Sequence, residues 1–538
     1  MEVEMLVGLS LTVLTGAACV PSALYQRAPH RWREIIPLLL GALFLVSVAA
    51  AVSVFRNGPL DTLFWRLPNG WQWGIYFDGL SVVMLMLISL IAWVNAVYAR
   101  RYLDGDPGQG RFYKWFTLTV AAVVWMVVAR DLLTLWLAWI VTSLGLHQLL
   151  LFYPARPWAV WTARKKFLIS RLGDVFLGVG IGTIWYEFGT LEFASLFANL
   201  NAAEAEVGNG SLVSLAAVML VLGALTKSAQ FPFHSWLPDT LETPTPVSAL
   251  MHAGIINAGG FLMIRMSPLV SESTVAMNGL WMTGAFTALM AAVVMLTQTS
   301  IKRALAWSTI AQMGFMMLQC GLGAWTAALL HLVAHSLYKS YAFLSSGSAV
   351  EGLRTAATHR YIAANRFQPS SSSNWGTLGI LTLGLTLSLT LSWIVTRLAG
   401  FDYSSKQGFV LLGLIQVIGL AHLLQRSLSS MNTMVGLRGV GTATLVLCGY
   451  WAGYLLIDQA LAASVGSATR NWTLTDQIFL GMWALILTLL YVLANFPRAW
   501  KSWIFGPNLY VHATNGFYLD VPVRHLTAWC WGLRSPAP

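Results

Sequence analysis

The sequence contains few charged side chains for its length. Only 10% of its 538 residues are charged, while 57% are hydrophobic. A soluble enzyme is not this apolar, and apolar stretches long enough to cross a bilayer recur along the whole chain. The scarcity of charge therefore indicates a polytopic membrane protein.

Two further classes of protein are excluded by what the sequence lacks. Its four cysteines are scattered, with no paired spacing, which argues against a disulfide framework or a cysteine-based metal site. The net charge of +11 does not indicate a nucleic-acid partner, because the basic residues lie between apolar runs and not in one patch. We therefore expect no metal or other cofactor in this chain, and no nucleic acid.

Apolar spans of ~20 residues predict an all-α fold of about fifteen transmembrane helices. The first spans occupy residues 1–111, the last occupy 429–496, and a tail follows at 497–538. The N-terminus lacks the basic region of a cleavable signal peptide, so the first span is expected to remain as a helix. Most Lys and Arg residues fall in alternate loops, which predicts an external N-terminus and a cytoplasmic tail.

Lys227 stands at the end of the apolar run Ser211–Leu225, where a charge is not expected. A charge near the centre of a bilayer costs ~2.5–3.5 kcal/mol, so such a residue indicates a functional site. Prolines follow at positions 232, 238, 244 and 246 and cannot continue a regular helix. A broken helix near Lys227 is therefore predicted, as is typical of ion pathways.

A second group of titratable residues lies further along the chain. His331, His335 and Lys339 are spaced i, i+4 and i+8, which stacks them on one helix face over about 12 Å. Such a row can pass protons through intervening water. Each histidine alone would be interpreted as a buried packing residue. A metal site is disfavoured because no Asp, Glu or Cys completes it on the same face.

Several longer segments carry specific motifs. They are Phe77–Ser81 (FDGLS), Arg171–Val175 (RLGDV), Thr226–Gln230 (TKSAQ), Pro244–Ala253 (PTPVSALMHA) and Ile301–Thr309 (IKRALAWST). Together with the His331, His335 and Lys339 row, these motifs resemble the proton-conducting antiporter-like subunits of respiratory complex I and Mrp-type antiporters. The resemblance is greatest to the L-type, or chain 5, branch of that family.

The resemblance implies two inverted five-helix repeats, at residues 112–267 and 268–428. Lys227 matches the family's central lysine on a broken helix, and His252 matches the histidine on the next helix. His331, His335 and Lys339 match a row that connects the two half-channels. Asp239 falls in a loop motif of the family, where a loop-stabilising role and a role in proton transfer both remain open.

The sequence also departs from the family pattern. The family has a glutamate after the tryptophan of its fifth helix, paired with the central lysine, but Trp139–Ser143 contains no carboxylate. His147, two helical turns on, is either a titratable replacement or a packed histidine. Residues 367–396 contain no Lys or Arg, although family members carry a lysine in this region. This region therefore does not predict a standard second half-channel.

Residues 241–260 and the tail segment Asn515–Asp520 are most similar to the DabB membrane subunits of bacterial inorganic-carbon (DAB) systems. This resemblance implies a multi-pass protein of the bacterial inner membrane that is not itself an enzyme. Its partner would be a cytoplasmic DabA-like subunit, zinc-containing and similar to a β-carbonic anhydrase, whose CO2 hydration is driven by protons. The alternatives are a subunit of an Mrp or NADH-quinone oxidoreductase complex, and a non-conducting membrane anchor.

Two segments are candidate interaction surfaces. The polar loop Glu351–Asn374 is either a docking surface for the partner or a solvated linker. The tail segment Phe517–Trp531 mixes apolar, aromatic and basic residues, which predicts a helix that lies against membrane lipid or against the partner.

Overall fold

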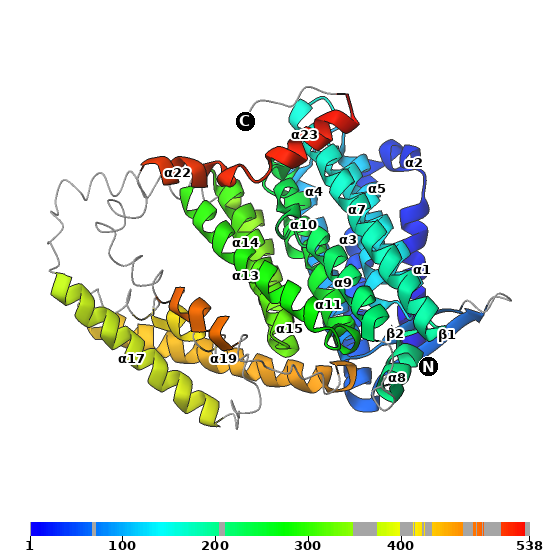
Figure 1. Cartoon of the computed structure of the whole chain (residues 1–538). Helices are drawn as coiled ribbons and strands as arrows, with labels where there is room; N and C mark the ends of the chain where they lie inside the picture. The colour runs from blue at the N-terminus through cyan, green and yellow to red at the C-terminus, as the bar shows by residue number, and fades with distance from the viewer. Residues whose placement is uncertain are drawn as a thin grey trace.

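Figure 1 shows the chain as a computed structural model built mainly from long helices. The structure describes residues 2–66, 72–203, 210–347, 374–398, 433–465 and 507–532, with shorter stretches between 413 and 424 and between 477 and 488. Within these residues, nine helices are long and apolar enough to cross a membrane. The prediction of a polytopic membrane protein is therefore confirmed, whereas the count of fifteen helices and the two repeats remain predictions.

The N-terminal half of the bundle contains helices α1 to α9. They are α1 (Glu2–Cys19), α2 (Ser22–Arg27), α3 (Pro29–Asn57), α4 (Gly79–Tyr102), α5 (Gln109–Val128), α6 (Leu132–Leu150), α7 (Pro157–Phe188), α8 (Phe193–Ala203) and α9 (Gly210–Lys227). Aspartates begin two of the spans: the side chains of Asp78 and Asp131 accept the backbone N–H of Ser81 and Thr134 at 2.9 and 2.8 Å. These caps satisfy N–H groups that have no partner within the helix.

A two-stranded antiparallel hairpin, β1 (Leu60–Arg66) and β2 (Gln72–Phe77), precedes α4. The prediction of an all-α fold is wrong for this segment. Both strands are rich in aromatic and branched residues, which favour extended backbone. At six and seven residues, they are too short to register in a search for spans of ~20 apolar residues.

The second part of the bundle contains two helices that are long but comparatively polar. Its elements are η1 (Phe233–Trp236), η2 (Thr240–Glu242), α10 (Thr245–Ala253), η3 (Ile255–Asn257), α11 (Ala258–Arg265), α12 (Ser267–Val270), α13 (Thr274–Thr297), α14 (Ile301–Gly321) and α15 (Trp325–Leu344). Although α14 and α15 have 21 and 20 residues, neither belongs to the nine apolar spans. Their polar side chains lower the hydropathy, and these are the side chains of the candidate site.

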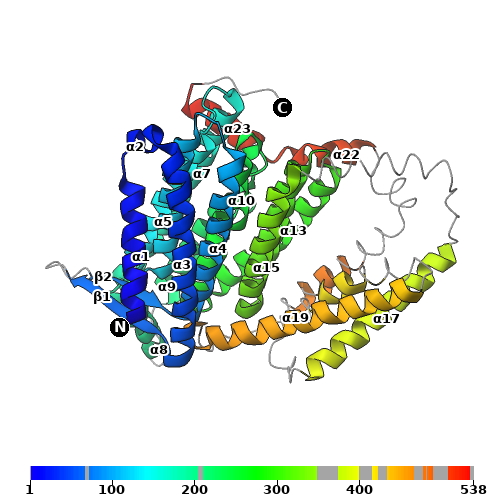
Figure 2. The ribbon, with the colours of Figure 1, turned by 180° about the vertical axis from the view of Figure 1, so that it is seen from behind.

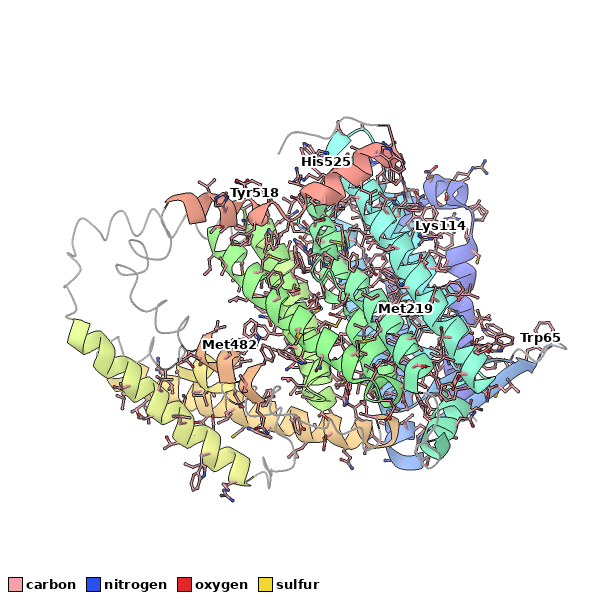
Figure 3. All side chains as sticks on the ribbon, in the orientation of Figure 1. Trp65, Lys114, Met219, Met482, Tyr518 and His525 are labelled. Carbon is pink, nitrogen blue, oxygen red and sulfur yellow. The ribbon has the colours of Figure 1, made fainter. Side chains whose placement is uncertain are left out.

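The C-terminal elements lie beside the bundle and across one of its ends. They are α17 (Asn374–Leu398), α19 (Thr433–Val465), α22 (Pro507–Thr514), η4 (Gly516–Tyr518) and α23 (Val521–Cys530). In both ribbon views α19 runs crosswise to α13 and α15 (Figures 1 and 2). Helices α22 and α23 lie across the end of the bundle opposite the β-hairpin, where Figure 3 labels Tyr518 and His525. The candidate docking loop Glu351–Asn374, apart from its last residue, and most of residues 399–428 of the predicted second repeat lie outside the described residues.

A buried ion pair joins the start of α4 to the end of α11. Arg265 donates to both carboxylate oxygens of Asp78, at 2.5 and 3.0 Å, and to the Ser81 hydroxyl at 2.6 Å. A bidentate pair of this kind adds geometric specificity to its charge interaction. It fixes the end of α11, and therefore the register of the segment that carries His252.

Two neighbouring chain segments lose helical geometry in the middle of the bundle. Helix α9 ends at Lys227, and Ala229 adopts a positive φ of 49°. The facing segment is interrupted by η3, between α10 and α11. The Ser228 hydroxyl donates to the Ile256 carbonyl at 2.7 Å and joins the two interruptions. The helix break that the prolines predicted is therefore present, and a second one faces it.

Gly259 allows this close approach. A Cβ atom at this position would lie 2.4 Å from Ser228 Oγ and 2.5 Å from the Ala224 carbonyl oxygen. We expect Gly259→Ala to lower the free energy of unfolding by about 1–3 kcal/mol, because the two segments must separate. Thermal unfolding of the detergent-purified protein measures this change.

Gly279→Ala is the matched control, since a Cβ atom there, in α13, meets nothing within 4 Å. Alanine is favoured over glycine in a helix, so this variant is expected to match or exceed the wild-type stability. Equal losses in the two variants would contradict the close contact at Gly259.

Candidate functional site

Lys227 is held by neutral groups of α6. Its side chain is only 6% exposed, and its ammonium group donates to the Ser143 hydroxyl at 2.9 Å and to the Trp139 carbonyl at 3.2 Å. The same nitrogen lies 4.5 Å from the centre of the Trp139 ring, within the range of a cation–π contact. No carboxylate in the described part of the chain forms an ion pair with Lys227. The Ser143 hydroxyl, the Trp139 carbonyl and the Trp139 ring thus stabilise the Lys227 ammonium group where the family has a glutamate.

A second buried lysine is bonded to the same serine, Ser143. Lys166 on α7 donates to the Ser143 backbone carbonyl at 2.6 Å, so Ser143 binds one lysine through its carbonyl and the other through its hydroxyl. Two ammonium groups in one buried site repel each other, so their proton occupancies are coupled. Lys166 ends the basic run Arg164–Lys166, which resembles a loop in the sequence, but the structure buries its side chain within the bundle.

One acidic side chain acts on both lysines. Asp174 on α7 forms a 2.7 Å ion pair with Arg171 and interacts electrostatically with Lys166 and Lys227. The three cations outnumber this single carboxylate. The site therefore has excess positive charge whenever both lysines carry a proton.

His147 is not bonded to Lys227. Its Nδ1 atom lies 3.1 Å from the Ala163 carbonyl oxygen, and its ring is tilted against Phe167 at 5.3 Å between ring centres. This contact fits a packed histidine whose polar atom is satisfied by backbone. A role for His147 in proton transfer stays a prediction.

His252 on α10 lies against α14 and α15. Its Nδ1 is 3.1 Å from the Thr309 hydroxyl oxygen, and its ring stacks on Phe343 at 4.3 Å. Because Thr309 donates its own proton to the Leu305 carbonyl, its oxygen accepts from the Nδ1–H of His252. This contact fixes the orientation of the imidazole beside the α15 row.

The three residues of the row have different partners. His331 is bonded through both ring nitrogens, each 2.9 Å from the side-chain oxygen of Gln319 or Gln312. Lys339 donates to the Leu305 carbonyl at 3.0 Å. Neither ring nitrogen of His335 has a hydrogen-bond partner among the described residues, although the side chain is buried. His335 is therefore the residue of the row that the protein leaves free to bond to water.

Neutral polar residues connect the break after Lys227 to helix α15, at the residue that follows His335. Asn257, at the end of η3, donates to the Ser336 hydroxyl on α15 at 2.7 Å, and the preceding residue, Ile256, accepts from Ser228. The search for titratable groups missed Asn257 and Ser336. The signal that could have found them is an amide or hydroxyl inside a span that is otherwise apolar.

Asp239 belongs to a different set of contacts. Its carboxylate accepts from Lys165 at 2.9 Å, and its backbone carbonyl accepts from the Thr162 hydroxyl at 3.0 Å. Lys165 also approaches Asp520 of the tail at 3.7 Å. Asp239 therefore ties the loop after α9 to α7 and the tail, and this geometry favours the loop-stabilising role.

The described residues contain no group of three or more His, Cys, Asp or Glu side chains placed to hold a metal ion. In the site around Lys227, the two lysines are bonded to Ser143 and Trp139, and Asp174 pairs with Arg171.

Two family models match this sequence. Residues 129–401 match the NADH:quinone oxidoreductase/Mrp antiporter transmembrane family, and residues 70–113 match the N-terminus of complex I chain 5. The matched ranges contain Lys227, His252 and the whole row on α15. The candidate site therefore lies entirely within the part of the chain that the first model covers.

Curated relatives match over most of the chain. The probable inorganic carbon transporter subunit DabB of Hydrogenovibrio crunogenus is 34% identical over 98% of this chain and 96% of its own length. Subunit DabB2 of Halothiobacillus neapolitanus is 35% identical over 98% and 94%. The NAD(P)H-quinone oxidoreductase chain 5 of Synechocystis sp. is 36% identical, over only 65% of this chain and 53% of its own length.

Solved structures support the fold. The Mrp complex from Dietzia sp. aligns with a TM-score of 0.65 at 24% identity, over 98% of this chain and 59% of that chain. An archaeal membrane-bound sulfane sulfur reductase aligns with a TM-score of 0.57 at 18% identity, over 95% and 99%. At these identities the similarity shows the arrangement of the helices alone.

The contact between Asp239 and Lys165 gives a direct test of the loop assignment. Asp239→Asn removes the charged partner of a buried ammonium group, so we expect the free energy of unfolding to fall by about 1.5–3 kcal/mol. Thermal unfolding of the purified protein measures the loss. Asp104→Asn is the control: its 2.6 Å pair with Arg33 is largely exposed, and its removal should cost less than about 1 kcal/mol. Similar losses in both variants would contradict the structural role of Asp239.

Proposed function

Because this chain belongs to the NADH:quinone oxidoreductase/Mrp antiporter family, and to its inorganic carbon transporter branch, we propose that it is the proton-conducting subunit of an inorganic carbon uptake system. The full-length similarity to two inorganic carbon transporter subunits supports inorganic carbon as the transported substrate. The buried, carboxylate-poor lysine pair at Ser143 is the observation that supports proton conduction. It places within the membrane a lysine whose positive charge appears and disappears as a proton binds and leaves.

In the first step of the proposed mechanism, Lys227 is the switchable charge. When Lys166 and Lys227 are both protonated, their repulsion favours release of one proton, because Asp174 is the single carboxylate among the described residues that offsets their charge. The Ser143 hydroxyl and the Trp139 carbonyl can accept from Lys227 while it is charged. The released proton leaves toward the helix break at Ser228.

In the second step, the proton moves along α15. His252 and Lys339 both interact electrostatically with His335, so a charge on one changes the energy of a proton on the others. Histidine gains and loses protons near neutral pH, and water bonded to the free nitrogens of His335 can bridge the gaps. His331, held by two glutamines, ends the row.

The finer architecture belongs to the same proposal. We place about fifteen helices in the bacterial inner membrane, with inverted repeats at 112–267 and 268–428, the N-terminus outside and the tail in the cytoplasm. Arg100, Arg101 and Arg156 support this orientation, since all three come from connections on one side of the predicted topology. The β-hairpin would then face the outside (Figure 2).

The proposed partner is a cytoplasmic DabA-like subunit that contains zinc and resembles a β-carbonic anhydrase. The relatives are named as transporter subunits, which supports a complex of more than one chain. In this proposal the partner hydrates CO2 to bicarbonate, and proton movement through this chain drives that reaction in one direction. The chain itself holds no cofactor and performs no covalent chemistry.

Two alternatives make different predictions. A subunit of an Mrp or NADH-quinone oxidoreductase complex is favoured by the similarity to chain 5 of Synechocystis sp.. A non-conducting anchor is favoured by the absent fifth-helix glutamate and by the lack of Lys and Arg in residues 367–396. A protonophore that fails to block inorganic carbon uptake by the intact complex would support the anchor.

Replacement of the central lysine tests the mechanism. We expect Lys227→Ala to abolish protonophore-sensitive uptake of labelled inorganic carbon, because the switchable charge is lost, while the complex still assembles in the membrane. Lys114→Ala is the matched control (Figure 3): Lys114 is also buried, but it donates to the Ala18 carbonyl on α1, far from the row. Uptake retained by Lys227→Ala would remove Lys227 from the mechanism.

Gentle purification tests the partner. A tagged chain solubilised in mild detergent is expected to retain a stoichiometric, zinc-containing subunit of carbonic-anhydrase type, identified by mass spectrometry and metal analysis. Recovery of several antiporter-like membrane subunits, or of flavin and iron–sulfur proteins, would place the chain in an Mrp or respiratory complex and contradict the inorganic carbon assignment.

A further inference from the structure

A cavity of about 420 Å³ lies between the tail and the bundle, apart from the row on α15. Its walls come from the loop after α9, from the start of α14, and from η4 and α23 of the tail. Figure 3 labels Tyr518 and His525 of its tail wall at the end of the bundle opposite the β-hairpin. Its lining includes His234, Ser235, Arg303, Trp307 and Arg524.

Four polar atoms around the cavity lack protein partners. They are His234 Nδ1, Ser235 Oγ, Arg303 Nε and Trp307 Nε1, none of which has a hydrogen bond within the described part of the chain. His234, Ser235 and Trp307 are only 1, 4 and 5% exposed. A buried polar atom without a hydrogen-bond partner destabilises the folded protein by about 1–3 kcal/mol. Four such atoms around one cavity therefore indicate that one ligand binds to all of them.

The chemistry of these atoms defines what the ligand must be. The indole N–H of Trp307 and the guanidinium N–H groups of Arg303 can only donate, and the Ser235 hydroxyl can donate as well. Burial and the nearby Lys165 lower the pKa of His234 to about 4, so its ring is neutral at physiological pH and donates from one nitrogen. The ligand must therefore accept several hydrogen bonds at once.

The charges around the cavity favour a single negative charge. Lys165 pairs with Asp239, and Arg524 pairs with Asp520. Arg303 has no ion pair with any described residue, which leaves one uncompensated positive charge at the cavity wall. The two aspartates would repel a dianion more strongly than a monoanion.

We propose that this cavity binds a small oxyanion group of single negative charge, with Arg303 as its counter-ion and Trp307 and Ser235 as hydrogen-bond donors. Free bicarbonate and the phosphate of a lipid headgroup share this chemistry. Bicarbonate is the source that we favour, which rests on the proposed function, since bicarbonate is the product that function implies. The cavity would then hold product at the end of the bundle assigned to the cytoplasm.

The experiment follows ¹³C-bicarbonate by NMR line broadening as it is added to the purified full-length protein, together with any partner subunit that stays bound. The titration is run at constant ionic strength against sodium chloride. We expect saturable broadening in wild type, weakened about tenfold or more by Arg303→Gln and severalfold by Trp307→Phe. Trp307→Phe keeps the aromatic packing and removes only the N–H, so it remains informative if Arg303→Gln folds poorly.

Lys302→Gln is the matched control, because it removes a neighbouring positive charge of the same helix that does not line the cavity. It should bind within about twofold of wild type if the site is specific. Equal weakening by Lys302→Gln and Arg303→Gln would overturn the proposal. So would an absence of saturable broadening, unless native mass spectrometry finds a phospholipid that wild type retains and Arg303→Gln loses, which would assign the same site to a lipid phosphate.

This test is independent of proton conduction. Lys227→Ala should retain bicarbonate binding, since Lys227 lies outside the cavity. If the wild-type protein binds bicarbonate at this cavity but the wild-type complex takes up no inorganic carbon, the proposed function is contradicted and the oxyanion site is retained. If the wild-type complex takes up inorganic carbon but the protein shows no specific binding, the oxyanion site is contradicted and the proposed function is retained.

Discussion

The burial of the Lys227 ammonium group, with no carboxylate bonded to it among the described residues, is the constraint on which the rest of the site depends. The charge must be stabilised by dipoles and an aromatic face, and α6 supplies both through Ser143 and Trp139. Helix α9 ends at this residue, and the Ser228 hydroxyl satisfies a carbonyl of the facing interruption. The helix breaks, the glycine contact and the polar bridge to α15 are all arranged around this one charge.

The same site departs from electroneutrality. Lys166, Lys227 and Arg171 face a single carboxylate, that of Asp174. A fixed lysine–glutamate pair would be stabilised in its charged form and would resist proton loss. Two lysines bonded to one serine carry excess positive charge. The gain or loss of one proton therefore changes the electrostatic energy of the site strongly. The missing glutamate is therefore compatible with conduction, because coupling between cations can take over its role.

The sequence predicted the features of the site that depend on residue types rare in apolar spans. Lys227 and the α15 row stood out because charges are scarce in apolar spans, and prolines marked the helix break. Lys166 was missed because it ends a basic run that resembles a loop. Gln312 and Gln319 were missed because neutral amides give no charge signal. Contacts such as those with Ser143 join residues distant in the chain, and no local pattern encodes them.

Proton flux through the purified assembly tests the central claim most directly. The complex would be reconstituted into liposomes that enclose a pH-sensitive dye, and a potassium diffusion potential would be imposed with valinomycin. Conduction through the buried row predicts a voltage-dependent change of internal pH, well above that of protein-free liposomes and faster when CO2 is supplied. An internal pH that follows the protein-free control with and without CO2 would contradict the account and identify the chain as a passive anchor.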